Sequence, residues 1–198
     1  MAEKQTIISI GREYGSGGHV IAENLAARFG LPLYDYNLLH EIADEKELDP
    51  KKLEKYDELP KSRLFSRTVR GYSNSPQENI ANLQFDYLKK KAADGKSFVI
   101  VGRCSEFILK GTPGLITIFV LGDKDQKLER IMKIKRVSEA EAKGLILYHD
   151  KRRKSYHNYY CDGKWGDSRN YDFSINSSKL GIEETTDVIA DYVKRRQG

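Results

Sequence analysis

The sequence predicts an α/β fold in which helices cover both faces of a parallel sheet of about five strands. Two observations predict this class. Short apolar runs alternate with helical patterns along the whole chain, and such alternation builds a parallel sheet with crossover helices. The run Phe98–Val101 is apolar at every position, as expected of a strand that is buried on both faces.

The expected elements form one domain, residues 1–198, with three layers. We expect strands at 6–10, 31–35, 98–101, 115–121 and 173–176. We expect helices at 19–29, 36–45, 77–93, 138–158 and 182–196, and a charged helix that ends near 134. The helix at 138–158 opens with Ser138-Glu139-Ala140-Glu141, the pattern of a capping box.

A glycine-rich turn joins the first strand to the first helix. Gly15, Gly17 and Gly18 fall within four residues, so the backbone can adopt positive φ and bring its N–H groups close to a ligand. The start of the helix adds a dipole that favours an anion. Strand, glycine loop and helix in this order are typical of P-loop nucleotide-binding proteins. A turn that needs glycine only for its backbone is the alternative.

The loop lacks the lysine that reaches the β- and γ-phosphates in the pattern G-x-x-x-x-G-K-[ST]. Aligned on that pattern, Gly18 stands at the lysine, His19 at the hydroxyl residue and Arg12 at the first glycine. We therefore expect a degenerate P-loop in which another cation replaces the lysine.

Composition predicts a soluble cytoplasmic protein with an anionic ligand. Hydrophobic residues make up 39% and charged residues 32% of 198 residues. No apolar run is long enough to cross a bilayer, and the first strand follows the N-terminus without a signal peptide. Two cysteines, Cys104 and Cys161, are too few for a disulfide framework. The net charge of +5 and the pI near 9.0 suit an anion.

Two stretches between the first and third strands carry polar candidates. Asp35 ends the second strand, where it would lie at the ligand crevice or cap the next helix. Residues 46–75 are charged, weakly periodic and interrupted by prolines, which predicts short helices in a mobile insertion. This insertion carries Ser62, Arg63, Arg67 and Arg70. Its arginines suit a phosphate clamp, and a solvated helix face is the alternative.

The third strand and the longest helix each bring arginines toward the same crevice. Arg103 follows the buried strand through Gly102, so we expect it at the crevice rim, gripping the phosphate of an acceptor. The densest charge is Asp150-Lys151-Arg152-Arg153-Lys154, flanked by tyrosines and histidines. Asp150 and Arg153 share a helix face. The same patch could bind single-stranded nucleic acid or simply be a solvated helix.

Metal and thiol chemistry have weaker support in the sequence. His149, His157, Cys161 and Asp162 lie close together in the chain, but their spacing matches no closed zinc pattern. Cys104 shows no fixed base beside it, as a nucleophile would need. We therefore predict no metal ligands and no nucleophilic cysteine.

The chain resembles the cytidylate kinase-like family, relatives of bacterial cytidylate kinase among the nucleoside monophosphate kinases. The resemblance spans nearly the whole chain, and its opening block and its tryptophan-containing block are the specific ones. The residues that carry it are Ile8-Ser9-Ile10-Gly11-Arg12-Glu13-Tyr14-Gly15-Ser16-Gly17-Gly18, Tyr34-Asp35, Val101-Gly102-Arg103, Asp150-Lys151-Arg152-Arg153, Trp165-Gly166-Asp167 and Asn170-Tyr171-Asp172.

The resemblance implies a P-loop NTPase-type three-layer sandwich with two mobile parts. The insertion at about 46–75 would close over a monophosphate, and residues 150–165 would be the lid. The implied activity is transfer of the ATP γ-phosphate, with Mg²⁺, to an acceptor such as CMP or dCMP. The family's glycine-arginine-aspartate element stands here as Gly102-Arg103-Cys104. The arginine is kept and the carboxylate is lost, so a preference for cytosine does not follow.

Each candidate then has an expected role. The ATP phosphates would lie on Gly15, Ser16, Gly17, Gly18 and His19. Arg12, Arg152 and Arg153, the last oriented by Asp150, would replace the lysine charge. The acceptor would meet Gly102, Arg103, Arg63 and Arg67, with Asp35 near the acceptor or a metal-bound water.

Several alternatives stay open at this stage. One is a kinase for another small molecule, and another is a nucleotide-binding regulatory protein without useful catalysis. A nucleic-acid-binding module is the least favoured. The expected partner is a small-molecule nucleotide and not a membrane, and a homodimer remains open.

Overall fold

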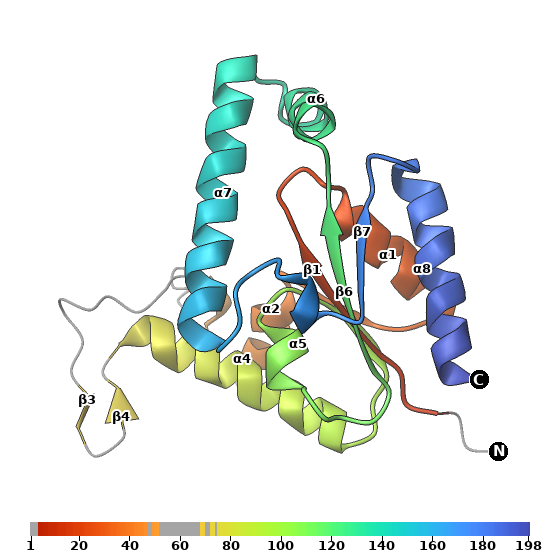
Figure 1. The fold of residues 1–198 in the computed structure, drawn as a ribbon. Coiled ribbons are helices and arrows are strands. Elements are labelled where there is room, and N and C mark those ends of the chain that lie inside the picture. The colour runs from red at the N-terminus through yellow and green to blue at the C-terminus, as the bar shows by residue number, and fades with distance from the viewer. Residues whose placement is uncertain (1–3, 47–48, 52–67, 70–71, 74) are drawn as a thin grey trace.

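The computed structural model describes residues 4–46, 49–51, 68–69, 72–73 and 75–198. Its centre is a sheet of five parallel strands in the order β2-β5-β1-β6-β7 (Figure 1). The strands are β1 (Ile7–Arg12), β2 (Leu33–Tyr34), β5 (Phe98–Val101), β6 (Leu115–Leu121) and β7 (Phe173–Asn176). The prediction of an α/β fold with about five parallel strands is confirmed.

Helices cover both faces of this sheet because neighbouring strand residues point to opposite sides. Ile8 and Ile10 of β1 pack with α1 (Gly18–Phe29) and α8 (Gly181–Gln197) on one face. Ile7 of β1 packs on the other face with α2 (Leu38–Lys46) and α4 (Pro76–Ala93). Val99 and Val101 of β5 join the first core cluster, and Phe98 and Ile100 join the second. The unbroken apolar run of β5 is therefore explained by burial on both faces.

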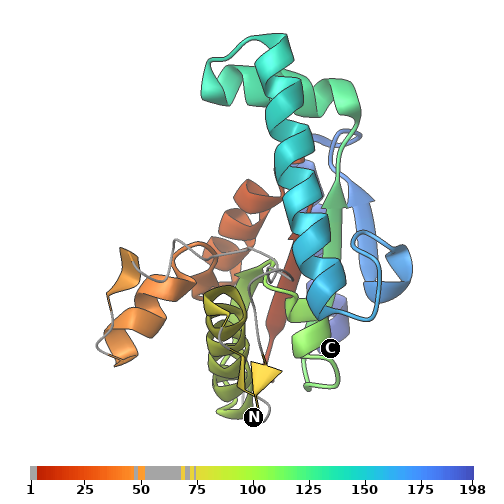
Figure 2. The same cartoon turned by 90° about the vertical axis from the view of Figure 1, so that its left-hand side faces the viewer.

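Two helices extend beyond the sheet and place the polar candidates of the second half of the chain. Helix α6 (Lys124–Lys135) follows β6, and the long helix α7 (Glu139–Tyr160) runs back beside the sheet (Figures 1 and 2). Helix α7 starts with the predicted capping box, in which the Ser138 N–H donates to Glu141 Oε2 at 2.9 Å. Its carboxyl end packs with α4 and with the short helix α5 (Ser105–Ile108) in a third core cluster.

The segment predicted as a lid, 150–165, consists of the second half of α7 and the loop that follows. Tyr156, His157 and Cys161 of this segment are buried. The middle of this segment is therefore anchored against α4 and α5, and its role as a lid stays a prediction. A 3₁₀ turn at Ser168–Asn170 then leads into β7.

The described part of the predicted insertion contains a small antiparallel hairpin, β3 (Thr68–Val69) with β4 (Tyr72–Ser73). We expected only short helices there, and this was wrong for these four residues, which include β-branched and aromatic types that favour strands. Ser62, Arg63, Arg67 and Arg70 lie outside the described residues. Among the described helices, none is both long and apolar enough to cross a membrane.

Candidate functional site

The glycine loop between β1 and α1 has a backbone that only glycine adopts easily. Gly15 and Gly17 have φ values of +83° and +82°. A Cβ on Gly15 would lie 3.1 Å from the Lys127 carbonyl oxygen, and one on Gly17 would lie 3.1 Å from Ile182. Both positions combine left-handed backbone with close neighbours, so the two glycines are required by the loop itself.

Hydrogen bonds fix the rest of this loop from both sides. The buried Ser16 donates through Oγ to the Glu13 carbonyl at 2.8 Å, and its own carbonyl accepts from Ser177 Oγ at 2.5 Å. The first turn of α1 carries no acidic residue, so the positive helix end is not neutralised by its own side chains. The loop and helix thus have the strand–loop–helix geometry that the sequence predicted.

Arg12 explains why glycine stands where a P-loop would carry lysine. A Cβ on Gly18 would lie 2.6 Å from the Arg12 Cβ and 3.3 Å from the Val120 Cβ. The Arg12 guanidinium also approaches Gly102, which has a φ of +75°. It occupies the place that a Cβ on Gly102 would take. Arg12 therefore occupies the space beside the loop that a longer residue at position 18 would need.

A lysine does lie at the loop, but it comes from α6. Lys127 is buried, and its Nζ lies 2.9 Å from Glu13 Oε2 and 3.6 Å from Asp150 Oδ2. The other oxygen of Asp150 accepts the Tyr14 N–H at 2.7 Å. Burial raises the pKa of Asp150, against the Tyr14 hydrogen bond and the Lys127 charge, which lower it. This network of Lys127, Glu13 and Asp150 joins α6 and α7 to the glycine loop.

Arg130, one helical turn after Lys127 on α6, also contacts the loop. Its Nη1 donates to the Gly15 carbonyl at 2.6 Å and lies 3.2 Å from the place of a Cβ on Gly17. Sequence reasoning missed Lys127, Arg130 and the role of Glu13. The only available signal was that Lys127 and Ile131 share a helix face by their i, i+4 spacing.

Three of the predicted arginines line one small cavity. Arg12, Arg103 and Arg153 lie around about 30 Å³ at the carboxyl edge of β1 and β5, together with Gly11, Gly102, Cys104, Glu106, Tyr156, His157, Trp165 and Tyr171. Arg153 Nη1 donates to the Arg12 carbonyl at 3.4 Å, and its Cζ lies 5.5 Å from the centre of the Tyr14 ring. Arg152 is half-buried on α7 and does not line this cavity.

The segment that carries Arg103 has an unusual backbone. Gly102, Arg103 and Cys104 have φ values of +75°, +59° and +56° in succession, and the left-handed region is unfavourable for the last two. Arg103 is 4% exposed, and its Nη2 donates to the Asp35 carbonyl at 3.3 Å. Strained residues that the surrounding structure holds in place are common at ligand sites.

Asp35 lies between this cavity and the start of α1. Its Oδ2 is 3.5 Å from His19 Nε2, and its Oδ1 accepts the Asn37 N–H at 3.0 Å. The alternative that Asp35 caps the next helix is wrong, because α2 starts at Leu38 and Asn37 precedes it. The carboxylate is at the edge of the crevice, next to the residue that replaces the P-loop hydroxyl.

Comparison with known proteins gives one family and several similar solved structures. The model of the cytidylate kinase-like family matches residues 7–179. The crystal structure of an uncharacterized protein from Eubacterium ventriosum ATCC 27560 is 40% identical, with a TM-score of 0.77, and the match covers 96% of this chain and 99% of that one. The search of curated proteins found no match.

More distant structures share the fold. A shikimate kinase from Bacteroides thetaiotaomicron is 12% identical with a TM-score of 0.56, over 96% of this chain and 98% of that one. A shikimate kinase from Acinetobacter baumannii, in complex with shikimate, is 15% identical with a TM-score of 0.50, over 98% and 95%. At these identities the likeness concerns the fold alone, which is that of P-loop kinases.

Proposed function

The chain belongs to the cytidylate kinase-like family, and on this premise we propose that it transfers the γ-phosphoryl group of ATP to a small acceptor. The first candidates for the acceptor are CMP and dCMP. The kinase-like fold supports phosphoryl transfer. The activity and the identity of the acceptor are both part of this proposal.

The observation that supports the proposal best is the convergence of Arg12, Arg103 and Arg153 on one cavity beside the glycine loop. Phosphoryl transfer needs positioning and charge neutralisation more than covalent chemistry. The three guanidinium groups would supply the positive charge, and the start of α1 would add its dipole. Guanidinium groups also bind phosphate oxygens in pairs, which fixes the orientation of the acceptor.

The loop residues Gly15, Ser16, Gly17, Gly18 and His19 would hold the phosphates of ATP. The positive φ of Gly15 and Gly17 and the start of α1 fit a polyphosphate. Of the carboxylates, Asp35 lies next to His19, so it would hold Mg²⁺, directly or through water. Bound Mg²⁺ would neutralise charge on the phosphates, and Asp35 would remain in contact with the acceptor side through the Arg103 hydrogen bond.

The arginines share the role that the lysine has in other P-loops. Arg12 is fixed beside the loop and would contact the transferred group, and Arg153 would approach it from α7. Arg152 would add charge at longer range because it lies outside the cavity. Lys127 is already matched by Glu13 and Asp150, so we assign it to positioning the loop and not to the transferred phosphate. Asp150 would act through Lys127 and Tyr14, and its predicted orientation of Arg153 remains a prediction.

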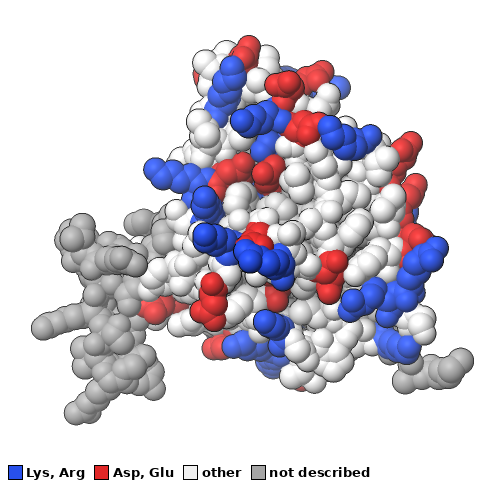
Figure 3. Space-filling model, viewed as in Figure 1, with Lys and Arg blue, Asp and Glu red and all other residues white. Residues whose placement is uncertain are grey.

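A nucleotide-binding protein without catalysis is the second candidate, and the absence of a lysine at Gly18 favours it. A nucleic-acid surface on residues 148–160 has less support. Tyr156 and His157 are buried, and His149 stacks on Tyr14 with ring centres 4.1 Å apart. Basic and acidic side chains are also interspersed over α6 and α7 on the face shown in Figure 3.

The test is a panel of acceptors assayed with ATP and Mg²⁺, with ADP formation as the readout. The panel contains CMP, dCMP, the other nucleoside monophosphates and, because the fold is shared with shikimate kinases, shikimate. We expect ADP formation that depends on one class of acceptor. ATP-induced thermal stabilisation without turnover on any acceptor would favour the non-catalytic protein. If ATP neither stabilises the chain nor is consumed, the proposal is wrong.

A further inference from the structure

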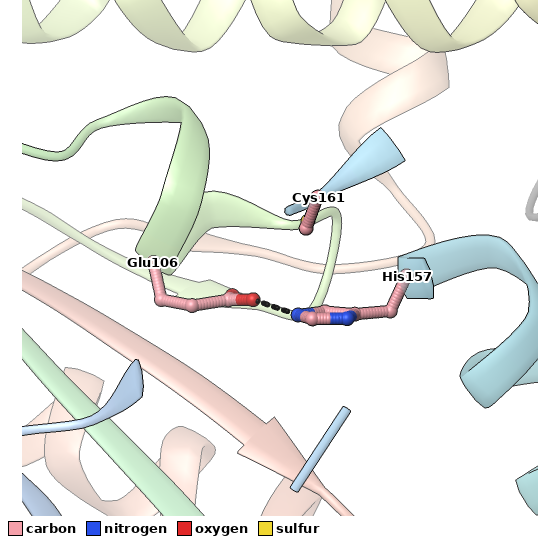
Figure 4. A group of neighbouring side chains, drawn as sticks. All are labelled: Glu106, His157 and Cys161. Carbon is pink, nitrogen blue, oxygen red and sulfur yellow. Dashed lines mark hydrogen bonds and ion pairs between the residues drawn. The ribbon is translucent and has the colours of Figure 1, made fainter. Parts of the chain in front are cut away.

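A buried group of polar side chains lies at the junction of α5 and the end of α7, next to the arginine cavity, which two of its members also line. It consists of Glu106, His157 and Cys161, whose ligand atoms lie within 4.8 Å of one another. Figure 4 shows the three side chains pointing toward one another. His157 Nε2 and Glu106 Oε1 are 2.6 Å apart, and all three residues are buried.

The residues that lie near His157 in the chain form a different set. His149, His157, Cys161 and Asp162 are the candidate metal ligands that the sequence alone brings together. The structure separates this set, since His149 stacks on Tyr14 at the glycine loop. Glu106, which is 51 residues from His157 in the chain, takes its place. The expectation of no metal ligands was made without this long-range neighbour.

The donor types fit zinc. Thiolate, imidazole and carboxylate are the three ligand types that proteins use for Zn²⁺, and three protein ligands with one further position form its open sites. His157 is in the last turn of α7 and Cys161 is its C-cap, and the Cys161 N–H donates to the His157 carbonyl at 2.8 Å, one turn back along the chain. Glu106 in the first turn of α5 faces them.

A bound zinc ion would change the distances between the three ligand atoms. A tetrahedral zinc ion at about 2.0–2.1 Å from nitrogen and oxygen holds the two atoms roughly 3.3 Å apart. The His157–Glu106 pair, at 2.6 Å, would open by roughly 0.7 Å as the ion replaces the shared proton. The Cys161 thiol, which lies within 4.8 Å of both atoms, would also move, to roughly 3.5 Å from each of them.

An open cavity adjoins the group and supplies the remaining position. Glu106, His157 and Cys161 all line a cavity of about 330 Å³, together with Lys110 and Arg169. Cys104, the other cysteine, is hydrogen-bonded to Cys161 but lines only the small arginine cavity, which Glu106 and His157 also line. We propose that Glu106, His157 and Cys161 bind a zinc ion whose fourth position faces this larger cavity and is taken by water.

The ion would connect the two elements that carry the arginines of the phosphate site. Glu106 lies three residues after Arg103, and His157 lies four residues after Arg153. Coordination of one ion by Glu106 and His157 would therefore fix the distance between α5 and α7. This in turn would fix the spacing between Arg103, just before α5, and Arg153 on α7. Metal binding is measured without turnover, so this inference can fail while the proposed kinase activity holds, and the reverse.

The test starts with the full-length protein, stripped of metal with a chelator and titrated with Co²⁺. We expect one equivalent to give the visible bands of a tetrahedral site and a thiolate-to-cobalt charge-transfer band in the near ultraviolet, both displaced by Zn²⁺. Zn²⁺ should also raise the unfolding temperature of the stripped protein. A folded wild-type protein that gives no charge-transfer band overturns the proposal, whatever the variants do.

Matched variants identify the ligands. Cys161→Ser should lose the charge-transfer band, and His157→Gln and Glu106→Gln should each weaken Co²⁺ binding by at least about tenfold. Cys104→Ser, at the neighbouring buried cysteine, and His40→Gln, at an exposed histidine, should bind Co²⁺ as the wild type does. Retention of the band in Cys161→Ser, or its loss in Cys104→Ser, contradicts the assignment.

Discussion

The Lys127 ammonium lies 2.9 Å from the Glu13 carboxylate, so a residue of α6 neutralises the acid in the glycine loop. Glu13 Oε2 also accepts the Gly122 N–H at 3.2 Å. The Lys127 side chain is 8% exposed, against 27% for Glu13 and 20% for Asp150. The pair therefore lies mostly away from water, where the loss of one partner is costly.

We expect Lys127→Met to lower the free energy of unfolding by about 2–3 kcal/mol, because two carboxylates would lose their shared cation. Urea unfolding followed by circular dichroism measures this. Adding Glu13→Gln to Lys127→Met should cost less than Glu13→Gln alone, since the pair no longer exists. Lys124→Met, at an exposed lysine of the same helix, is the control and should change stability by less than about 0.5 kcal/mol.

The result also decides between two roles for Lys127. If this lysine replaced the P-loop lysine, Lys127→Met would abolish turnover and leave stability nearly unchanged. If Lys127→Met lowers stability and also weakens ATP binding, the result supports the positioning role.

Gly18→Lys should not restore a working P-loop. The new side chain would collide with Arg12, whose Cβ lies 2.6 Å from the place of the added Cβ. We expect lower stability, by about 1–3 kcal/mol as in other overpacked sites, and no gain in turnover. Gly144→Lys on α7, where nothing lies within 4 Å of an added Cβ, is the control and should stabilise the helix. An active Gly18→Lys protein would show that Arg12 moves aside.

Gly17→Val changes the loop backbone as well as the space for a ligand. The φ of +82° at Gly17 is strained for valine, so this variant would lose stability as well as nucleotide binding.

The sheet could be predicted because its signal is local. Apolar runs such as that of β5 are buried on both faces, and the glycine loop has its own backbone requirement. The contacts of Lys127 could not be predicted in the same way. Helix α6 carries several lysines, and only the packing of α6 on the loop decides which of them turns inward.

In the candidate site, too, residues with a local sequence signal could be predicted and residues placed by long-range packing could not. Arg12, Arg103 and Arg153 were predicted because each follows a recognisable strand or helix pattern. Glu106 was not predicted as a partner of His157, because no local pattern joins residues from α5 and α7. The prolines and charges of the insertion predicted helices, whereas its described hairpin contains strand-forming residues that the breakers obscured.

Arg153→Ala should lower kcat by about 10³-fold on whichever acceptor reacts, because removing a cation that meets the charge of the transferred group has this effect. Arg153 already contacts the Arg12 carbonyl, so KM for ATP should rise as well. Arg153→Lys should recover part of the rate, because a point charge cannot form two parallel hydrogen bonds. Lys154→Ala, at the exposed neighbour, is the control, and near-normal turnover in Arg153→Ala would remove this residue from the reaction centre.

Arg103 allows a test that separates stability from acceptor binding. Its φ of +59° costs roughly 1 kcal/mol in any residue with a Cβ. Glycine avoids this cost, so Arg103→Gly should be more stable than Arg103→Ala by about 1 kcal/mol, the reverse of the usual order. Both variants lose the guanidinium and should raise KM for the acceptor to a similar extent, with KM for ATP much less affected. Thermal unfolding and steady-state kinetics on the two variants measure these quantities. Arg103→Ala more stable than Arg103→Gly would mean that the backbone of Gly102-Arg103-Cys104 is not strained in solution, and an unchanged KM for the acceptor would separate this arginine from acceptor binding.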